Sequence, residues 1–295
     1  MKYLLVDAGG TKTKAVVYDE ETKNFLNTFV GKSGSYAVKH EEALHEIKRV
    51  IASVFRGDVK AIGIGASGIG ACQNIGEFKN GLAEEFKVPV FLENDAYIAL
   101  YSILKDTHTS GALVLSGTGS SVLTKNGKDT VLTGGWGHLL TEEGSAYKIA
   151  IDAFKKAIYD FEEGLPNSKL TVKLLASLGL KEIVDIKKFV YRSDKAGIAK
   201  GSIVVREMAT LGDRNALSVI ESAGKFLASD VIHGARKLKL KEIYLGFRGG
   251  YIERDKVLQS LIVKNIEKEG FKVLLENNPT DPIMGAYYMI KNGGK

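Results

Sequence analysis

The chain has 295 residues, of which 44% are hydrophobic, so it can bury a substantial core and most simply forms two globular domains. Its net charge of +6 comes from Lys and Arg interspersed with Asp and Glu, so we expect no nucleic-acid partner. A single cysteine, Cys72, excludes disulfides within the chain and Cys-rich metal sites, and no apolar run approaches the roughly 18 residues of a membrane span.

The first predicted elements are three strands joined by short turns. Apolar runs predict these strands at residues 3–8, 13–18 and 25–30. Helical spacing and further apolar runs then predict an alternating series: helix 41–55, strand 59–65, helix 76–86, strand 88–92 and helix 95–104. The N-terminal apolar run is too short for a signal peptide, so we expect a cytoplasmic protein without membrane contact.

The same pattern begins again after residue 110. Three more strands are predicted at residues 111–115, 120–124 and 129–132. Helices dominate from residue 142 to about 237, and the chain then alternates again: strand 241–245, helix 252–269, strand 271–275 and helix 282–291. The repetition predicts two similar α/β domains that face each other across a cleft, each presenting a glycine-rich hairpin to it.

The first of these hairpins carries an aspartate, two glycines and a run of hydroxyl and cationic residues. Its turn reads Asp7-Ala8-Gly9-Gly10-Thr11-Lys12-Thr13. Backbone N–H groups, hydroxyls and cations suit the outer phosphates of a nucleotide, and a carboxylate at a buried strand end is costly unless something pairs with it. We therefore expect a phosphate site here, with Asp7 holding Mg²⁺ directly or through water.

Two other glycine-rich turns follow predicted strands. The turn Ser116-Gly117-Thr118-Gly119-Ser120 repeats the first arrangement and predicts a second phosphate contact. Gly249 and Gly250 lie between a strand and a helix, where bare backbone could lie against a flat adenine ring; an ordinary helix-start turn is equally compatible with them. The stretch Gly63–Gly68 has the spacing of a dinucleotide fingerprint but not its position in the chain, and we read it as a tight turn.

Asp95 begins a predicted helix directly after a strand, next to Asn94. Such a pair can cap the helix, and the same carboxylate can act as the general base that takes a proton from an attacking hydroxyl.

The stretch 134–147, GGWGHLLTEEGSAY, contains the only tryptophan of the chain. Thr141 could cap the following helix, with Glu142 and Glu143 in its first turn. The glycine density around Trp136 predicts close backbone packing beside a ligand.

Taken together, these motifs resemble the sugar kinase/Hsp70/actin superfamily. Within it the chain is similar to the N-acetylglucosamine kinase and BadF/BcrA-type ATPase family over essentially its whole length. The matching stretches are DAGGTKTK at 7–14, Asn94-Asp95, SGTGS at 116–120, GGWGH with EGSAY within 134–147, RGG at 248–250 and PIMGAYY at 282–288.

The resemblance implies two ribonuclease-H-like, actin-like ATPase domains. The first would span residues 1–108 joined by the last helix at about 280–295, and the second would span residues 109–279 with a helical insertion. A homodimer acting on a small molecule is expected.

The resemblance also implies a role for each matched stretch. Asp7, Gly9, Gly10, Thr11 and Lys12 would form the first phosphate site. Gly117, Thr118 and Gly119 would form the second, and Gly249 and Gly250 would border the adenosine. Asp95 would be the catalytic base, and the sugar would be bordered by Ser35, Asn94, Trp136, Gly137 and Glu142.

Two positions depart from the family pattern. Family members that bind hexose or N-acetylhexosamine carry Asn near the position of Ser35, and a sugar-contacting Asp near that of Glu142. The carboxylate of a sugar acid such as 2-keto-3-deoxygluconate would instead be bound by a cationic side chain. Candidates for that side chain are Lys32, Lys39 and His138.

The sequence therefore predicts an ATP- and Mg²⁺-dependent kinase of a hexose, an N-acetylhexosamine or a sugar acid. The alternatives are an ATPase that activates a partner protein, for which Cys72 is a poor cluster ligand, and a sugar-binding regulator without catalysis.

Overall fold

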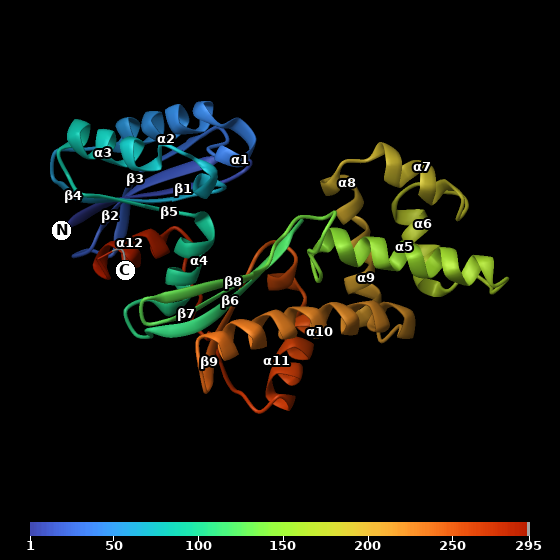
Figure 1. Ribbon diagram of the computed structural model, residues 1–295. Helices are drawn as coiled ribbons and strands as arrows, with labels where there is room; N and C mark the ends of the chain where they lie inside the picture. The colour runs from blue at the N-terminus through green and yellow to red at the C-terminus, as the bar shows by residue number, and fades with distance from the viewer. Residues whose placement is uncertain (294–295) are drawn as a thin grey trace. The chain divides into compact units, whose positions relative to one another are not determined.

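The computed structural model describes residues 1–293 (Figure 1). Residues 294 and 295, where the first predicted domain ends, lie outside the described residues. The chain forms two compact units: Met1–Thr109 together with the described residues from Glu276 onward, and Ser110–Leu275. Each unit contains one five-stranded sheet.

The sheet of the first unit has the strand order β3-β2-β1-β4-β5. Its strands are β1 (Lys2–Ala8), β2 (Thr13–Asp19), β3 (Asn24–Gly31), β4 (Val59–Ala66) and β5 (Val90–Glu93). The first three are antiparallel and tightly connected, whereas β4 and β5 run parallel to β1. Parallel neighbours need long crossovers, and helices supply them. The helices of this unit are α1 (Tyr36–Lys39), α2 (Glu41–Val54), α3 (Ile75–Phe86), α4 (Asp95–Leu104) and α12 (Met284–Lys291).

Both faces of this sheet are covered, because alternate residues of β1 point to opposite sides. Leu4 and Val6 join a core formed with α2 and α3. Leu5 joins a second core that includes Ile98 of α4 and Met289 of α12. The helix α12 thus returns from the end of the chain to complete the first unit.

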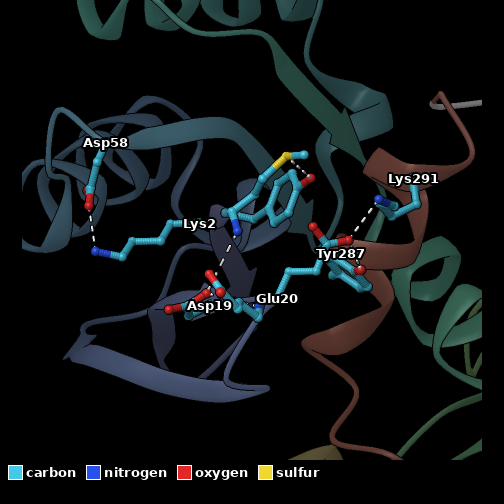
Figure 2. A network of polar contacts seen from close by, with 9 residues as sticks. Lys2, Asp19, Glu20, Asp58, Tyr287 and Lys291 are labelled. Atoms are coloured by element: carbon cyan, nitrogen blue, oxygen red, sulfur yellow. Dashed lines mark hydrogen bonds and ion pairs between the residues drawn. The ribbon is translucent and has the colours of Figure 1, made fainter.

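Polar contacts also hold α12 to the start of the chain (Figure 2). Glu20, just after β2, accepts hydrogen bonds from the Tyr287 hydroxyl at 2.7 Å and the Lys291 ammonium at 2.8 Å. Lys2, the first residue of β1, forms an ion pair with Asp58. The two hydrogen bonds of Glu20 hold α12 against a sheet that its apolar side already covers.

The sheet of the second unit has the order β10-β9-β6-β7-β8, which is the same topology with the strands renumbered. Its strands are β6 (Ser110–Ser116), β7 (Ser120–Asn126), β8 (Asp129–Gly134), β9 (Glu242–Arg248) and β10 (Lys272–Leu275). Its helices are α5 (Ala146–Glu162), α6 (Lys169–Ser177), α7 (Asp185–Arg192), α8 (Lys195–Ala199), α9 (Gly201–Thr210), α10 (Arg214–Lys237) and α11 (Lys256–Lys268). The architectural repeat predicted from the sequence is present.

Two helix starts differ from the sequence prediction. The helix α5 begins at Ala146, where the Ser145 side chain accepts a hydrogen bond from the Lys148 N–H, so the expected Thr141 cap is wrong. Glu142 therefore precedes the helix. The predicted helix 252–269 is a short 3₁₀ turn followed by α11, because the buried side chain of Asp255 caps the second segment at Leu258 N.

None of the described helices is long and apolar enough to cross a membrane.

Candidate active site

The first glycine-rich turn joins β1 to β2. Asp7 lies near the end of β1, opposite Lys14 of β2 on one side and Gly65 of β4 on the other. The Gly9 N–H donates to the Lys12 carbonyl at 3.0 Å and closes the turn. Its tip, formed by Gly10, Thr11 and Lys12, is exposed, so its groups can receive a ligand.

The segment that carries Ser35 packs directly on this turn. The Gly34 N–H donates to the Gly9 carbonyl at 3.2 Å, and the Thr13 hydroxyl donates to the Lys32 carbonyl at 2.8 Å. Ser35 is buried with 2% of its surface exposed. The structure therefore brings the predicted phosphate turn and the predicted sugar-contacting serine together within the first unit.

Asp95 is the first residue of α4. The Asn94 side chain caps the helix by accepting from the Ala96 N–H at 2.9 Å, and an oxygen of Asp95 lies at the same distance from that N–H. Asp95 also accepts a hydrogen bond from Ser67. The amide oxygen of Asn94 is thus occupied by the helix cap, while the Asp95 carboxylate is oriented from two sides.

Ser67 is a residue that the sequence analysis did not single out. Its N–H donates to the Ala8 carbonyl at 2.9 Å, and its own carbonyl accepts from the Tyr36 N–H at 2.8 Å. It therefore links the first turn, the Ser35 segment and Asp95. The available signal was its place just after β4, since carboxyl ends of neighbouring parallel strands meet at one sheet edge.

Burial makes Asp7 and Asp95 stronger bases than free aspartate, because it raises the pKa of each. The pKa of Asp7 is raised to about 6, mainly by burial and then by the charges of Asp95 and Asp281, against the opposing effect of Lys14 and Lys12. Burial also raises the pKa of Asp95, although the Ala96 N–H and Ser67 hydrogen bonds act in the opposite direction. A raised pKa is what general-base catalysis near neutral pH requires.

The surroundings of Asp7 fit a magnesium ion held mainly by other ligands. No group of three or more His, Cys, Asp or Glu side chains in residues 1–293 could hold a metal ion. Mg²⁺ in phosphoryl-transfer enzymes typically uses one or two carboxylates and completes its shell with water and substrate phosphates. A buried carboxylate whose pKa is raised has electrostatic strain that such a cation would relieve.

The second glycine-rich turn is braced by the segment that follows β8. The Ser116 hydroxyl donates to the Gly144 carbonyl at 2.7 Å, and the Ala146 N–H donates to the Gly117 carbonyl at 2.8 Å. The Tyr251 N–H donates to the Ser116 carbonyl at 3.2 Å. The end of the predicted stretch 134–147 and the residue after Gly249-Gly250 thus converge on this turn within the second unit.

A pocket of about 320 Å³ opens beside the turn. Gly117, Thr118 and Gly250 line one part of it, and the rest comes from α9 with the end of α8, from the start of α5 and from the turn that follows Gly250. Gly249 has a different role. Its φ is +120°, and a Cβ there would lie 2.5 Å from the Ser116 carbonyl oxygen, so only glycine fits at this position. Gly250 borders the pocket and Gly249 supports the turn.

Three cations of this pocket were missed by the sequence analysis. Lys200, Arg206 and Arg254 all contribute to its lining. They come from two helical segments about 50 residues apart in the chain, and each alone resembles an ordinary surface residue. Together they favour an anionic ligand.

The stretch around Trp136 forms a tight exposed hairpin. Gly137 pairs with Thr141, and the Trp136 side chain is 71% exposed. Gly134 packs within the chain, because a Cβ there would lie 2.6 Å from an Asp230 oxygen. Packing within the chain accounts for that glycine, while Trp136 and Gly137 lie on the surface of the second unit.

The profile of the BadF/BadG/BcrA/BcrD ATPase family matches residues 6–288. The chain belongs to this family. The resemblance stated from the sequence motifs is thereby confirmed.

Two curated relatives cover nearly the whole chain. An N-acetylmuramic acid/N-acetylglucosamine kinase of Clostridium acetobutylicum is 27% identical, with 99% of each chain covered. An N-acetyl-D-glucosamine kinase of Dictyostelium discoideum is also 27% identical and covers 99% of this chain and 98% of its own.

Solved structures of sugar kinases share the fold. A candidate N-acetylglucosamine kinase of Chromobacterium violaceum superposes with a TM-score of 0.71 at 21% identity, with 97% of each chain covered. A glucokinase of Streptomyces griseus, solved with glucose and AMPPNP, gives a TM-score of 0.57 at 18% identity, covering 97% and 98% of the two chains. The expected actin-like ATPase fold is confirmed.

Proposed function

We propose that this protein transfers the γ-phosphate of ATP to a hydroxyl of a small sugar or sugar acid. The observation that carries the proposal is the placement of Asp95: a buried carboxylate with a raised pKa, oriented by Ser67 and Ala96, in the same unit as the exposed Gly10-Thr11-Lys12 tip. Family membership and the kinase names of both curated relatives support the same reaction class.

In the proposed reaction Asp95 accepts the proton of the attacking hydroxyl. The hydroxyl oxygen bonds to the γ-phosphorus, and the bond from that phosphorus to the β–γ bridging oxygen breaks, which leaves ADP. Each glycine-rich turn is proposed as a phosphate contact within its own unit: the tip of the first offers N–H, hydroxyl and ammonium donors, and Thr118 of the second offers an N–H and a hydroxyl. Mg²⁺, held through Asp7, would neutralise phosphate charge.

The nucleotide would occupy the pocket of the second unit. Gly250 leaves room for a flat base, and nothing lies within 4 Å of where its Cβ would be. Lys200, Arg206 and Arg254 would interact with the anionic part of the nucleotide.

Two classes of acceptor fit this reaction. One is a neutral hexose or N-acetylhexosamine, and the other is a sugar acid. The Clostridium relative is named for both a neutral amino sugar and an acidic one. Of the candidate cations, Lys39 already pairs with Glu42 at 3.7 Å, and the His138 ring packs on Tyr147. Lys32 belongs to the segment that packs on the first turn, and is the one we favour for contacting an acidic acceptor.

The decisive experiment is ADP release from Mg-ATP with a panel of acceptors. The panel contains glucose, glucosamine, N-acetylglucosamine, N-acetylmannosamine, gluconate and 2-keto-3-deoxygluconate. We expect release only when an acceptor is present, and turnover confined to the acids would identify a sugar-acid kinase. Acceptor-independent release would instead indicate an ATPase that acts on a partner, and no release with any acceptor would contradict the kinase proposal.

A further inference from the structure

The Glu142 carboxylate lies against the second glycine-rich turn. Its two oxygens are 3.0 and 3.1 Å from the position that a Cβ on Gly119 would occupy. Only 12% of its side chain is exposed. The Ser120 hydroxyl donates to the neighbouring Glu143 carbonyl at 2.8 Å, which ties the two segments together. A fixed, poorly hydrated negative charge therefore borders the turn proposed to receive phosphate.

That charge has a partner on another element. Lys195, the first residue of α8, forms an ion pair with Glu142. Its backbone is held in place because the preceding Asp194 caps the helix, accepting from the Gly197 N–H at 2.7 Å. No feature of the local sequence links residue 142 to residue 195, and only the packing of α8 brings them together.

The electrostatic consequence is direct. An unpaired carboxylate a few ångströms from a bound phosphate raises the free energy of the complex, and low hydration strengthens the repulsion. An ammonium in contact with the carboxylate opposes this repulsion, because its attraction for the phosphate offsets part of the repulsion from the carboxylate.

We propose that Lys195 is a positioning residue for the nucleotide: by neutralising Glu142 it allows the turn at 116–120 to accept phosphate. The inference rests on the proposed function, because it assumes that a nucleotide phosphate binds at this turn. Lys195 need not touch the nucleotide. Its contribution is to remove the repulsion between Glu142 and the phosphate. Loss of Lys195 should therefore be compensated by loss of the Glu142 charge, which would not be so if Lys195 bound the phosphate directly.

The test is nucleotide affinity, measured by titration calorimetry with AMPPNP and Mg²⁺ in the full chain. We expect Lys195→Met to weaken binding by about tenfold or more, because the carboxylate is left unpaired. The double variant Lys195→Met/Glu142→Gln should recover affinity to within about threefold of wild type, because the repelling charge is gone. Lys195→Arg keeps the positive charge and should bind as wild type does.

A matched control comes from the same unit. Lys156 and Asp160 on α5 form an ion pair whose side chains are 32% and 13% exposed, almost the same as the 30% and 12% of Lys195 and Glu142. Lys156 lies ten residues beyond Ala146, or about 15 Å along the helix from the turn. Lys156→Met removes an equivalent ion pair and should leave nucleotide affinity unchanged.

Three outcomes would overturn the inference. Unchanged affinity of Lys195→Met would show that Glu142 does not repel the nucleotide. Failure of the double variant to recover, with wild-type unfolding temperatures, would show that Lys195 contacts phosphate itself. A tenfold loss in Lys195→Arg would show that geometry, not charge, is needed. If the wild-type protein binds no AMPPNP, the proposed function itself fails, and the wild-type titration separates that case.

Discussion

At the scale of single residues, Asp7 and Asp95 are carboxylates whose surroundings suit them to different tasks. Asp7 is buried and is repelled by the charges of Asp95 and Asp281, so its ionised form is unfavourable unless a cation binds. Asp95 is buried too, but the Ala96 N–H and Ser67 stabilise and orient its ionised form. The first environment suits a metal ligand, and the second suits a base that is ionised and aimed before the substrate binds.

Replacing Asp95 by Asn should strongly reduce catalysis without abolishing nucleotide binding. The amide keeps the shape and can still accept from the Ala96 N–H, but it cannot take a proton from the attacking hydroxyl. We expect kcat to fall by about 10²–10⁴-fold, with little change in AMPPNP affinity. A loss of nucleotide affinity as large as the loss of kcat would contradict the assignment.

Replacing Asp7 by Asn should stabilise the ligand-free protein at alkaline pH. Because the folded-state pKa is raised to about 6, folding favours the protonated form. That stabilisation is complete below about pH 4 and is lost as pH rises through 6. At pH 8 the free energy of unfolding of the variant should exceed that of wild type by up to about 3 kcal/mol. At pH 4 the two free energies of unfolding should match.

Urea unfolding at the two pH values measures this difference. Mg²⁺-dependent turnover should fall in the same variant, since the carboxylate that would hold the ion is gone. An equal change in stability at both pH values would mean that Asp7 acts through shape or hydrogen bonding and not through charge.

At the scale of elements, the contact of α12 with α4 positions the Asp95 helix. Gly285 lies so close to α4 that a Cβ there would overlap the Ile98 carbonyl, and the next turn of α12 places Met289 in the same core. Asp95 lies one turn before Ile98, so the close approach of the two helices also sets the position of the carboxylate that we propose as the base.

Gly285→Ala should therefore be severely destabilising. The methyl group meets backbone and not a flexible side chain, so one of the helices must shift; we expect a loss of more than about 3 kcal/mol in the free energy of unfolding. Gly81→Ala is the matched control, because Gly81 lies in α3 with nothing within 4 Å of its Cβ position. Alanine there should be neutral or stabilising by up to about 1 kcal/mol.

Most of the elements were predictable because burial leaves a local pattern in the sequence. The helix Glu41–Val54 has its buried apolar residues at helical spacing, and the strands 13–19 and 120–126 contain continuous apolar runs that are buried on both faces. The start of α5 was mispredicted because both Thr141 and Ser145 precede an amphipathic stretch, and local sequence does not decide between them. The contact of residues 142–146 with the turn at 116–120 holds this segment outside the helix.

At the scale of the whole molecule, the first unit depends on both ends of the chain. The sheet face of Leu5 and Val16 is covered by α4 and by the buried side chains Ile283 and Met289. Each such side chain contributes roughly 1.5–3 kcal/mol when buried. Together Ile283 and Met289 contribute roughly 3–6 kcal/mol, which is a large fraction of the roughly 5–15 kcal/mol that stabilises an ordinary domain.

A chain shortened after residue 279 should therefore lose the native structure of the first unit. We expect loss of the near-ultraviolet circular dichroism signal from Tyr3 and Tyr18, whose rings pack around Tyr287. A chain shortened after Lys291 keeps α12 and its contact with Glu20 and should unfold like the full protein. Native-like unfolding of the shorter chain would show that α12 is not needed for the first unit.

The sequence by itself determined most of the elements, the two glycine-rich turns and the family resemblance, because these depend on local pattern and on motifs contiguous in the chain; it also singled out Asp95 as the candidate base. Only the tertiary structure decided that Ser67 orients Asp95, that Lys200, Arg206 and Arg254 share one pocket, and that Glu142 pairs with Lys195. Those groups lie on different elements, and their meeting depends on how helices and sheets pack, which spacing along the chain does not encode.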